Sequence, residues 1–375
     1  MKITTPCHII DLDALKCNLE KSISKIRSEA NCSVLLALKG FSTLDILSFM
    51  RDYLDGVSAS GAFEAKLGKE WVGKHVCTYS PVYSKKEIDL IADNTNHLVF
   101  NSMRQFNEYN MLAKSKNCSC GIRINPEHSS LPDFFRANPC QKNSRLGVTY
   151  EQMPSLEMFD KGKIEGIHLH TMCDQYSDAL EDTIEHLIKN YEPYLKRIKW
   201  LNLGGGQMYA HKDYDIEKAI DVINKLHKLF DIEIFLEPCS GIMTNTGYFV
   251  SSVIDIIENG MNIAIIDASA VCHMPDVVFN GWYHDILGAD LIDKYPYKYR
   301  VAGSSCYAGD IWGDYSFTKP LTIGDYIIFE DTAMYSMVKN NYFNGLCMPS
   351  VNTYSKENGL KTIKTYNFNT FLSSL

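Results

Sequence analysis

Four positions in the 375-residue sequence carry groups suited to binding one cofactor. They are Lys39 after VLLAL, His170 at the end of IEGIHLH, the glycines Gly204, Gly205 and Gly206 after WLNL, and Glu237 at the end of IEIFLE. A lysine amine forms Schiff bases, and consecutive glycines let main-chain amides approach a phosphate. An imidazole can stack on a pyridine ring, and a carboxylate can pair with the ring's protonated nitrogen. Together the four positions predict a site for pyridoxal 5'-phosphate.

Each of these positions ends an apolar segment that we predict to be a β-strand. Continuous apolar segments are typical of parallel strands buried on both faces. Eight such segments are present, at residues 33–39, 54–60, 75–80, 97–102, 118–125, 164–171, 200–204 and 232–238. The stretches between and before them carry apolar residues at helical spacing, as in Leu19, Ile23 and Ile26.

Strands that alternate with helices over residues 13–245 predict a (β/α)8 barrel of the α/β class. An open, doubly wound sheet is the alternative, but it usually has fewer strands, and its G-x-G-x-x-G fingerprint is absent from the sequence. Barrel enzymes build their active sites at the carboxyl ends of the strands. We therefore expect Lys39, His170, Glu237 and the three glycines to lie on one rim.

The sequence beyond residue 245 has a different pattern. Segments such as YFVSSVIDII, MNIAIIDAS and DYIIFEDTAMYSM are rich in β-forming residues, with no long helix between them. The segment CHIIDL at residues 7–12 also reads as a strand. We therefore assign residues 1–12 and 246–375 to a smaller β domain.

Composition narrows the class of partner. The formal net charge of −8 disfavours nucleic acid and favours a cationic ligand. No apolar run approaches the roughly 20 residues that span a membrane, and the N-terminus lacks the pattern of a signal peptide. We therefore expect a cytoplasmic protein with reduced cysteines. Neither Cys118 with Cys120 nor the cluster around Cys173 has the second ligand pair of a zinc site, so no metal is predicted.

The motifs at the strand ends resemble those of fold type III pyridoxal-phosphate decarboxylases, the group of ornithine and diaminopimelate decarboxylases. The similar segments are ALKG, SRLG (144–147), GIHLHTMC, LGGG and LEP. The resemblance implies an alanine racemase-like barrel followed by a sheet domain. It implies that Lys39 is the Schiff-base lysine, that His170 rather than His168 stacks on the ring, and that Glu237 pairs with the pyridinium nitrogen.

The β domain continues the resemblance. SSCYAGD is similar to the C-x-x-x-D segment of the family, which implies that Cys306 is the catalytic thiol and proton donor and that Asp310 contacts substrate. GDYIIFEDTAMY is similar to a segment that implies a phosphate contact by Tyr335. In the family these thiol and carboxylate positions reach into the partner subunit's site, so the resemblance implies a homodimer with shared active sites.

Departures from the family pattern indicate the subgroup. E-P-G-R is replaced by E-P-C-S, with Cys239 and Ser240, and Cys173 stands where a serine is usual. The ornithine-type Y-D-H motif is absent, and HMPDVVFNGWYHDI (273–286) and NYFNG (341–345) most resemble carboxynorspermidine and carboxyspermidine decarboxylases. The implied reaction is decarboxylation of one of these compounds to norspermidine or spermidine in polyamine biosynthesis. The two substrates differ by one methylene, which the residues do not distinguish.

Two alternatives stay open at this point. One is an amino-acid decarboxylase of the diaminopimelate, ornithine or arginine type. The other is an inactive regulator similar to antizyme inhibitors, although Lys39, His170, Glu237 and Cys306 are all retained.

A further expectation concerns the substrate's distal end. When YHDI (283–286) is aligned with the Y-H-E-I of diaminopimelate decarboxylases, Asp276 falls where those enzymes carry an arginine. The arginine is understood to hold a carboxylate, so the inverted charge predicts that Asp276 binds an ammonium group.

Overall fold

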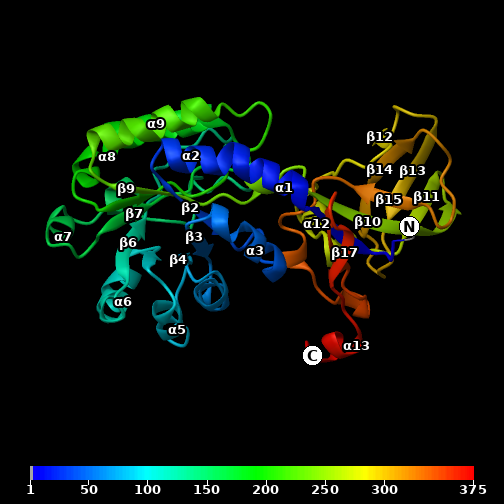
Figure 1. The fold of residues 1–375 in the computed structure, drawn as a ribbon, viewed down its shortest axis with the longest axis horizontal. Helices are drawn as coiled ribbons and strands as arrows, with labels where there is room; N and C mark the ends of the chain where they lie inside the picture. The colour runs from blue at the N-terminus through cyan, green and yellow to red at the C-terminus, as the bar shows by residue number, and fades with distance from the viewer. Residues whose placement is uncertain (1–2) are drawn as a thin grey trace. The chain divides into compact units, whose positions relative to one another are not determined.

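The computed structural model describes residues 3–375, and the chain divides into two compact units. The first comprises Asn18–Ile242, and the second comprises the chain up to Cys17 together with Met243–Leu375. The boundaries predicted from the sequence lie after residues 12 and 245. Figure 1 shows helices and strands in the first unit and mainly strands in the second.

The first unit is a closed barrel of eight parallel strands, which confirms the predicted (β/α)8 fold. Pairing of Ser33 with Phe235 and of Val34 with Leu236 closes it between the first and last strands. The strands are β2 (Ser33–Ala37), β3 (Gly56–Ala59), β4 (His75–Tyr79), β5 (His97–Phe100), β6 (Ser119–Arg123), β7 (Gly166–His168), β8 (Trp200–Asn202) and β9 (Glu233–Leu236).

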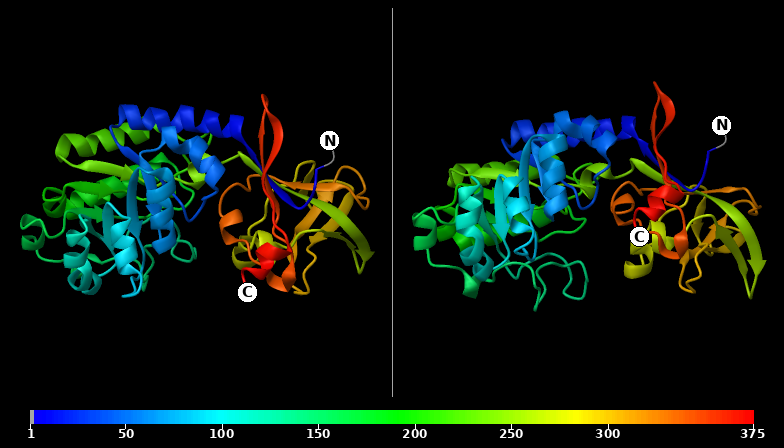
Figure 2. Two further views of the ribbon diagram at one scale, coloured as in Figure 1. Left: turned by 60° about the horizontal axis from the view of Figure 1, so that its bottom comes forward. Right: turned by 90° about the horizontal axis from the view of Figure 1, so that it is seen from below.

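Helices and short helical turns connect the barrel strands (Figures 1 and 2). The longer helices, α6, α8 and α9, bury one apolar face, and α8 packs beside α9. The elements are η1 (Leu19–Ile23), α2 (Ser24–Glu29), α3 (Leu44–Met50), η2 (Arg51–Tyr53), α4 (Ala62–Leu67), η3 (Gly68–Val72), α5 (Ile88–Asp93), α6 (Met103–Ser115), η4 (Tyr150–Gln152), α7 (Glu157–Asp160), α8 (Ser177–Leu195), α9 (Ile216–Leu229) and α10 (Ser240–Met243).

Several strands are shorter than the apolar segments that predicted them, because the chain leaves the hydrogen-bonded ladder before the apolar run ends. Strand β2 ends two residues before Lys39, β7 ends two residues before His170, and β9 ends one residue before Glu237. The candidate side chains therefore stand in the first residues of the loops, which is where a barrel places an active site.

The amino-terminal end of the barrel is filled by four rings, His75, His97, Trp200 and Phe235, which we call the barrel floor. His97 stacks on Trp200 with ring centroids 4.5 Å apart, and it meets His75 edge-on at 4.4 Å. A methyl group at Gly166 would lie 2.0 Å from the Trp200 indole, so only glycine lets the indole pack against β7. The four rings, which contact one another, therefore fill this end of the barrel.

The second unit is built on a mixed nine-stranded sheet. Its path is β12-β14-β13-β11-β10-β1-β16-β17, and β15 pairs with β10. The strands are β1 (Cys7–Asp11), β10 (Gly247–Glu258), β11 (Asn262–Ile266), β12 (Ala289–Leu291), β13 (Tyr297–Ala302), β14 (Ile311–Phe317), β15 (Tyr326–Phe329), β16 (Ser350–Ser355) and β17 (Gly359–Lys364). The N-terminal strand thus joins this sheet, between β10 and β16, as the sequence predicts.

Stacked aromatic rings form the centre of the sheet domain's core. Trp312 lies 4.4 Å from Phe329 and 5.5 Å from Phe249, and all three rings are buried. Short helices complete the unit, namely α1 (Leu12–Asn18), α11 (Ala270–His273), α12 (Asp276–Asn280), η5 (Met337–Lys339), η6 (Phe343–Gly345) and α13 (Phe368–Leu372). Within residues 3–375, no helix has the length and apolar character needed to cross a membrane.

The floor histidines predict that the barrel loses stability in acid. Burial lowers the pKa of His75 from its ordinary value of 6.5 to about 4. Burial, together with the charge of His75, lowers the pKa of His97 to about 3. Because the unfolded chain takes up these protons first as the pH falls, their stabilising effect is complete above about pH 6.5 and is lost progressively between about pH 6.5 and 3.

Urea unfolding at a series of pH values between about 7 and 4 measures this effect. Each histidine contributes a fall of up to about 1.4 kcal/mol in the free energy of unfolding per pH unit. His97→Phe keeps a ring against Trp200 but takes up no proton, so its stability should fall less steeply. Equal slopes for the variant and the wild type would contradict the prediction.

Candidate active site

The predicted cofactor residues of the barrel lie on one arc of its rim. Lys39 follows β2, His170 follows β7, the glycines follow β8, and Glu237 follows β9. In the closed barrel β7, β8, β9 and β2 are consecutive neighbours. Residues that are almost 200 positions apart in the chain are therefore brought to adjacent strand ends.

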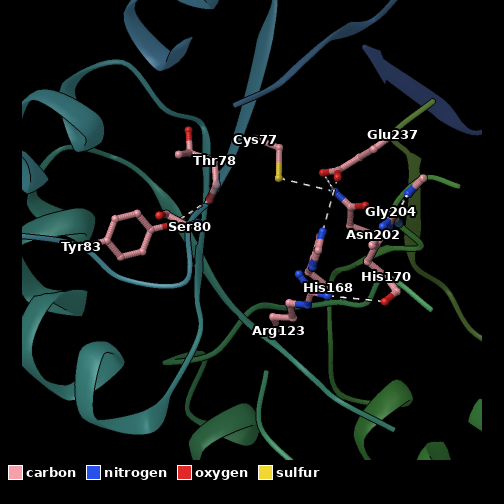
Figure 3. Close-up of polar contacts among 11 residues, drawn as sticks. Cys77, Thr78, Ser80, Tyr83, Arg123, His168, His170, Asn202, Gly204 and Glu237 are labelled. Atoms are coloured by element: carbon pink, nitrogen blue, oxygen red, sulfur yellow. Dashed lines mark hydrogen bonds and ion pairs between the residues drawn. The ribbon is translucent and has the colours of Figure 1, made fainter. Parts of the chain in front are cut away.

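Glu237 is the buried centre of this arc (Figure 3). Its Oε1 accepts a hydrogen bond of 2.8 Å from the Asn202 amide, and its Oε2 lies 3.4 Å from His168 Nε2. Burial would raise the pKa of Glu237, but His168, Lys39 and Asn202 outweigh it and hold the pKa at about 2. The carboxylate is therefore ionised throughout the physiological range, as pairing with a protonated ring nitrogen requires.

His170 lies next to the glycine segment and is held by it. Its Nδ1 accepts a hydrogen bond of 3.1 Å from the Gly205 amide, and its carbonyl accepts one of 3.5 Å from Arg123. Burial and the charges of Lys39 and Arg123 lower the pKa of His170 well below its ordinary value. The ring is thus neutral, and its proton is on Nε2, because Nδ1 is an acceptor. A neutral, fixed imidazole is suited to lie against an aromatic cofactor.

The glycine segment makes a compact turn that other residues would not fit. Gly204 has φ +67° and Gly206 has φ +91°. A Cβ at these positions would lie 2.4 Å from the Leu169 carbonyl oxygen and 2.1 Å from the Met172 carbonyl oxygen. Asn202 also accepts a 2.8 Å hydrogen bond from the Gly204 amide, which ties this turn to Glu237.

These residues fit a pyridine phosphate. The arc presents a lysine, a neutral imidazole, an ionised carboxylate and a glycine turn, which match the aldehyde, ring face, ring nitrogen and phosphate of such a cofactor. Two buried polar atoms beside the arc, Arg123 Nε and His168 Nδ1, have no hydrogen-bond partner in the described part of the chain.

A second layer of side chains supports the arc. The Arg123 guanidinium lies 4.6 Å from the centre of the Tyr79 ring, and that ring stacks on His168 at 5.2 Å. The Tyr79 hydroxyl donates to Asn101 Oδ1 at 2.7 Å, and the same oxygen accepts from the Gly147 amide. The SRLG segment is thereby attached to the rim through Asn101.

The sequence departures place neutral thiols beside the arc. Burial raises the pKa of Cys239 to about 12, against the opposing effect of Lys39. Burial and the adjacent Asp174 raise the pKa of Cys173 to about 12. Cys239 and Ser240 stand where the family pattern has glycine and arginine, and Cys173 stands where it has serine, so this chain carries no cationic side chain at these three positions.

Three supporting residues were missed in the sequence analysis: Asn202, Arg123 and Tyr79. Each is a polar or amphipathic residue within an apolar strand segment, which is a signal that sequence alone contains. The sequence presents His168 as one of three close zinc-ligand candidates, with His170 and Cys173, and as the histidine that does not stack, but not as a partner of Glu237. Its contact with Glu237 depends on the pairing of β7, β8 and β9.

In the sheet domain, Cys306 is an exposed free thiol on the loop before β14. The Cys306 amide donates a 2.7 Å hydrogen bond to Asn344 Oδ1 in the NYFNG segment. Asp310 is 3% exposed, and its two oxygens accept from the amides of Ala270 at 2.8 Å and Ser305 at 3.1 Å. These bonds hold the loop on α11, and each oxygen keeps a second lone pair, so the substrate contact of Asp310 stays a prediction.

Asp276 and Tyr335 both contact the ammonium group of Lys339, which was not among the residues predicted from the sequence. Asp276 begins α12 and forms an ion pair with Lys339, and its Oδ1 accepts from Asn280 at 3.2 Å. The Lys339 ammonium also lies 5.0 Å from the centre of the Tyr335 ring. Asp276 is therefore a carboxylate that already binds an ammonium group.

This chain is similar to known proteins over almost its whole length. The family described as "Pyridoxal-dependent decarboxylase, C-terminal sheet domain" matches residues 16–333. Carboxynorspermidine/carboxyspermidine decarboxylase of Campylobacter jejuni is 35% identical, with 98% of this chain and 97% of that protein covered. Carboxyaminopropylagmatine decarboxylase of Synechocystis is also 35% identical, with 100% of this chain and 96% of that protein covered.

Solved structures of decarboxylases also superpose on this chain. Carboxynorspermidine decarboxylase from Campylobacter jejuni, complexed with norspermidine, superposes with a TM-score of 0.89 at 33% identity, with both chains covered completely. Diaminopimelate decarboxylase from Helicobacter pylori superposes with a TM-score of 0.81 at 18% identity, which shows a shared fold alone. On the family match and these relatives, the chain belongs to the pyridoxal-dependent decarboxylases.

Proposed function

We propose that this protein uses pyridoxal 5'-phosphate to decarboxylate carboxynorspermidine or carboxyspermidine, giving norspermidine or spermidine and carbon dioxide. The observation that carries the proposal is the rim arc, in which an ionised Glu237, a neutral His170 and Lys39 meet at neighbouring strand ends. The names of relatives with full-length similarity support the substrate class.

When bound, the cofactor supplies an electron sink for the pair left behind as carbon dioxide departs. Lys39 would hold its aldehyde, His170 would lie on the ring face, and Glu237 would keep the ring nitrogen protonated. The turn at Gly204–Gly206 would lie against its phosphate, with Tyr335 as a further phosphate contact. Because the Gly204 and Gly205 amides already donate to Asn202 and His170, the Gly206 amide is the one that this turn would offer to the phosphate. Because Glu237 is buried, water competes little for its contact with the ring nitrogen.

Cys306 is proposed to deliver a proton to the carbon that has lost its carboxylate. A thiol suits this step because its pKa lies nearer to neutrality than that of a hydroxyl or ammonium group. We propose that the chain forms a homodimer in which Cys306 serves the partner's site. The hydrogen bonds that the Cys306 and Ser305 amides donate to Asn344 and Asp310 hold this loop in place.

A second substrate is favoured by a specific observation. The relative from Synechocystis matches this chain end to end at 35% identity and is named for carboxyaminopropylagmatine. That compound also carries a cationic group far from its carboxylate, so it too would pair with Asp276. Carbon dioxide release from carboxynorspermidine, carboxyspermidine, carboxyaminopropylagmatine and diaminopimelate tests the proposal. Turnover of diaminopimelate alone would overturn it.

Lys39 is expected to carry the cofactor covalently. Borohydride reduction of the loaded protein, followed by peptide mass mapping, should find the label on the peptide that contains Lys39. Lys39→Ala should lose nearly all turnover, because the covalent attachment has no substitute. A label on another lysine would refute the assignment.

Asp276→Asn is expected to lower kcat/KM for the polyamine substrate by about ten- to a hundredfold, because a charge-assisted contact is worth about 1.5–3 kcal/mol. The absorbance of the bound cofactor should not change. Lys339→Met is the matched control, since it removes the ion pair but keeps the carboxylate, and it should not lower kcat/KM. Near-wild-type kinetics for Asp276→Asn would contradict the assignment.

Shared active sites predict complementation between inactive variants. Lys39→Ala and Cys306→Ala proteins are mixed under conditions in which subunit exchange is verified by mass. Some mixed dimers then contain one intact site, so partial activity should return. If exchange is complete and no activity appears, the sites are not shared.

A further inference from the structure

His168 is a buried histidine that has no role in the reaction proposed above. It is the last residue of β7, it is 1% exposed, and its Nε2 faces Glu237 Oε2 at 3.4 Å (Figure 3). Asn202 occupies the other carboxylate oxygen at 2.8 Å. Each oxygen therefore accepts from one of these two donors and keeps a lone pair for a further donor. The buried Cys77 thiol also interacts with this carboxylate.

The protonation state of His168 follows from its surroundings. Its Nδ1 is buried and has no partner among the described residues, whereas Nε2 faces a carboxylate. An unpaired buried N–H would be costly, so the proton belongs on Nε2. Burial lowers the pKa of the ring, and the neighbouring Arg123 and Lys39 act in the same direction against Glu237. His168 is thus a neutral N–H donor to Glu237.

Contacts other than the one with Glu237 fix the orientation of the His168 ring. Tyr79 stacks on it with an interplanar angle of 16°, and the Tyr79 hydroxyl is fixed by Asn101. The Arg123 guanidinium lies over the same tyrosine ring. The ring therefore has little freedom to rotate away from Glu237. His170, two residues further on, makes a different contact, with the Gly205 amide.

We infer that His168 is a positioning residue that holds the Glu237 carboxylate in the orientation in which it receives the protonated ring nitrogen of the cofactor. This inference rests on the proposed function. Without the donor, the buried carboxylate would rotate about its remaining hydrogen bond to Asn202 and would take up a proton at a higher pH. A protonated Glu237 no longer offers the ring nitrogen a charge.

The test compares variants by their affinity for pyridoxal 5'-phosphate, measured by titrating the cofactor-free protein at about pH 8 and pH 5. His168→Phe keeps a ring to stack on Tyr79 but removes the donor, and His168→Gln keeps an N–H donor. For His168→Phe we expect the dissociation constant to rise by about tenfold or more at pH 8, and by a larger factor at pH 5. For His168→Gln we expect most of the affinity to return at both pH values.

His97→Phe is the matched control, because it also replaces a stacked and largely buried histidine, but in the barrel floor. It should bind the cofactor as the wild type does. If His168→Phe does not fold, His168→Met is compared with His168→Gln, since these two differ mainly in the donor. The inference would be overturned if His168→Phe, or in its place His168→Met, bound the cofactor with the same dissociation constant as His168→Gln at both pH values. The proposed function would then remain intact. Failure of the wild type to bind the cofactor would overturn both.

Discussion

The buried charge of Glu237 is the constraint on which the rest of the site depends. An ionised carboxylate removed from water costs several kcal/mol unless hydrogen bonds and opposite charges compensate for it. Here Asn202, His168 and the charge of Lys39 provide that compensation and hold its pKa at about 2. The same group must still offer a charge to a cofactor, so its protein partners leave lone pairs free. This requirement explains why the polar residues of the apolar strands converge on one carboxylate.

The barrel supplies these partners because it closes. Asn202 is on β8 and His168 on β7, and β8 pairs with both β7 and β9, which precedes Glu237. Asn202 also accepts from the Gly204 amide, so one side chain couples the carboxylate to the glycine turn. At the opposite end the stacked rings of the barrel floor fill the barrel, and Gly166 makes room for Trp200. A rigid floor and a polar rim are thus consequences of the same eight-stranded closure.

In the sheet domain, too, buried polar residues hold the backbone that carries a reactive side chain. Its exposed thiol, Cys306, is on a loop whose conformation is fixed from two sides, by Asn344 and by the buried Asp310. Buried carboxylates that accept main-chain amides are efficient at fixing loops, because each bond is charge-assisted. Asp276 and Lys339 form a second polar group in this domain, where one ammonium satisfies a carboxylate and lies over the Tyr335 ring. In both units, reactive groups stand on backbone that buried polar residues hold in place.

Sequence alone determined the fold class and the principal chemistry of this protein. Apolar segments of strand length recur eight times, and Lys39, His170 and Glu237 stand at segment ends, which any parallel barrel brings to one rim. Only the tertiary structure decided what each buried polar residue contacts. In the structure His168 contacts Glu237, Asp310 accepts hydrogen bonds from main-chain amides, and Asp276 forms an ion pair with Lys339. The reason is physical, because periodicity records which face of a strand is buried, whereas a hydrogen bond depends on the distance and direction between atoms that chain closure alone brings together.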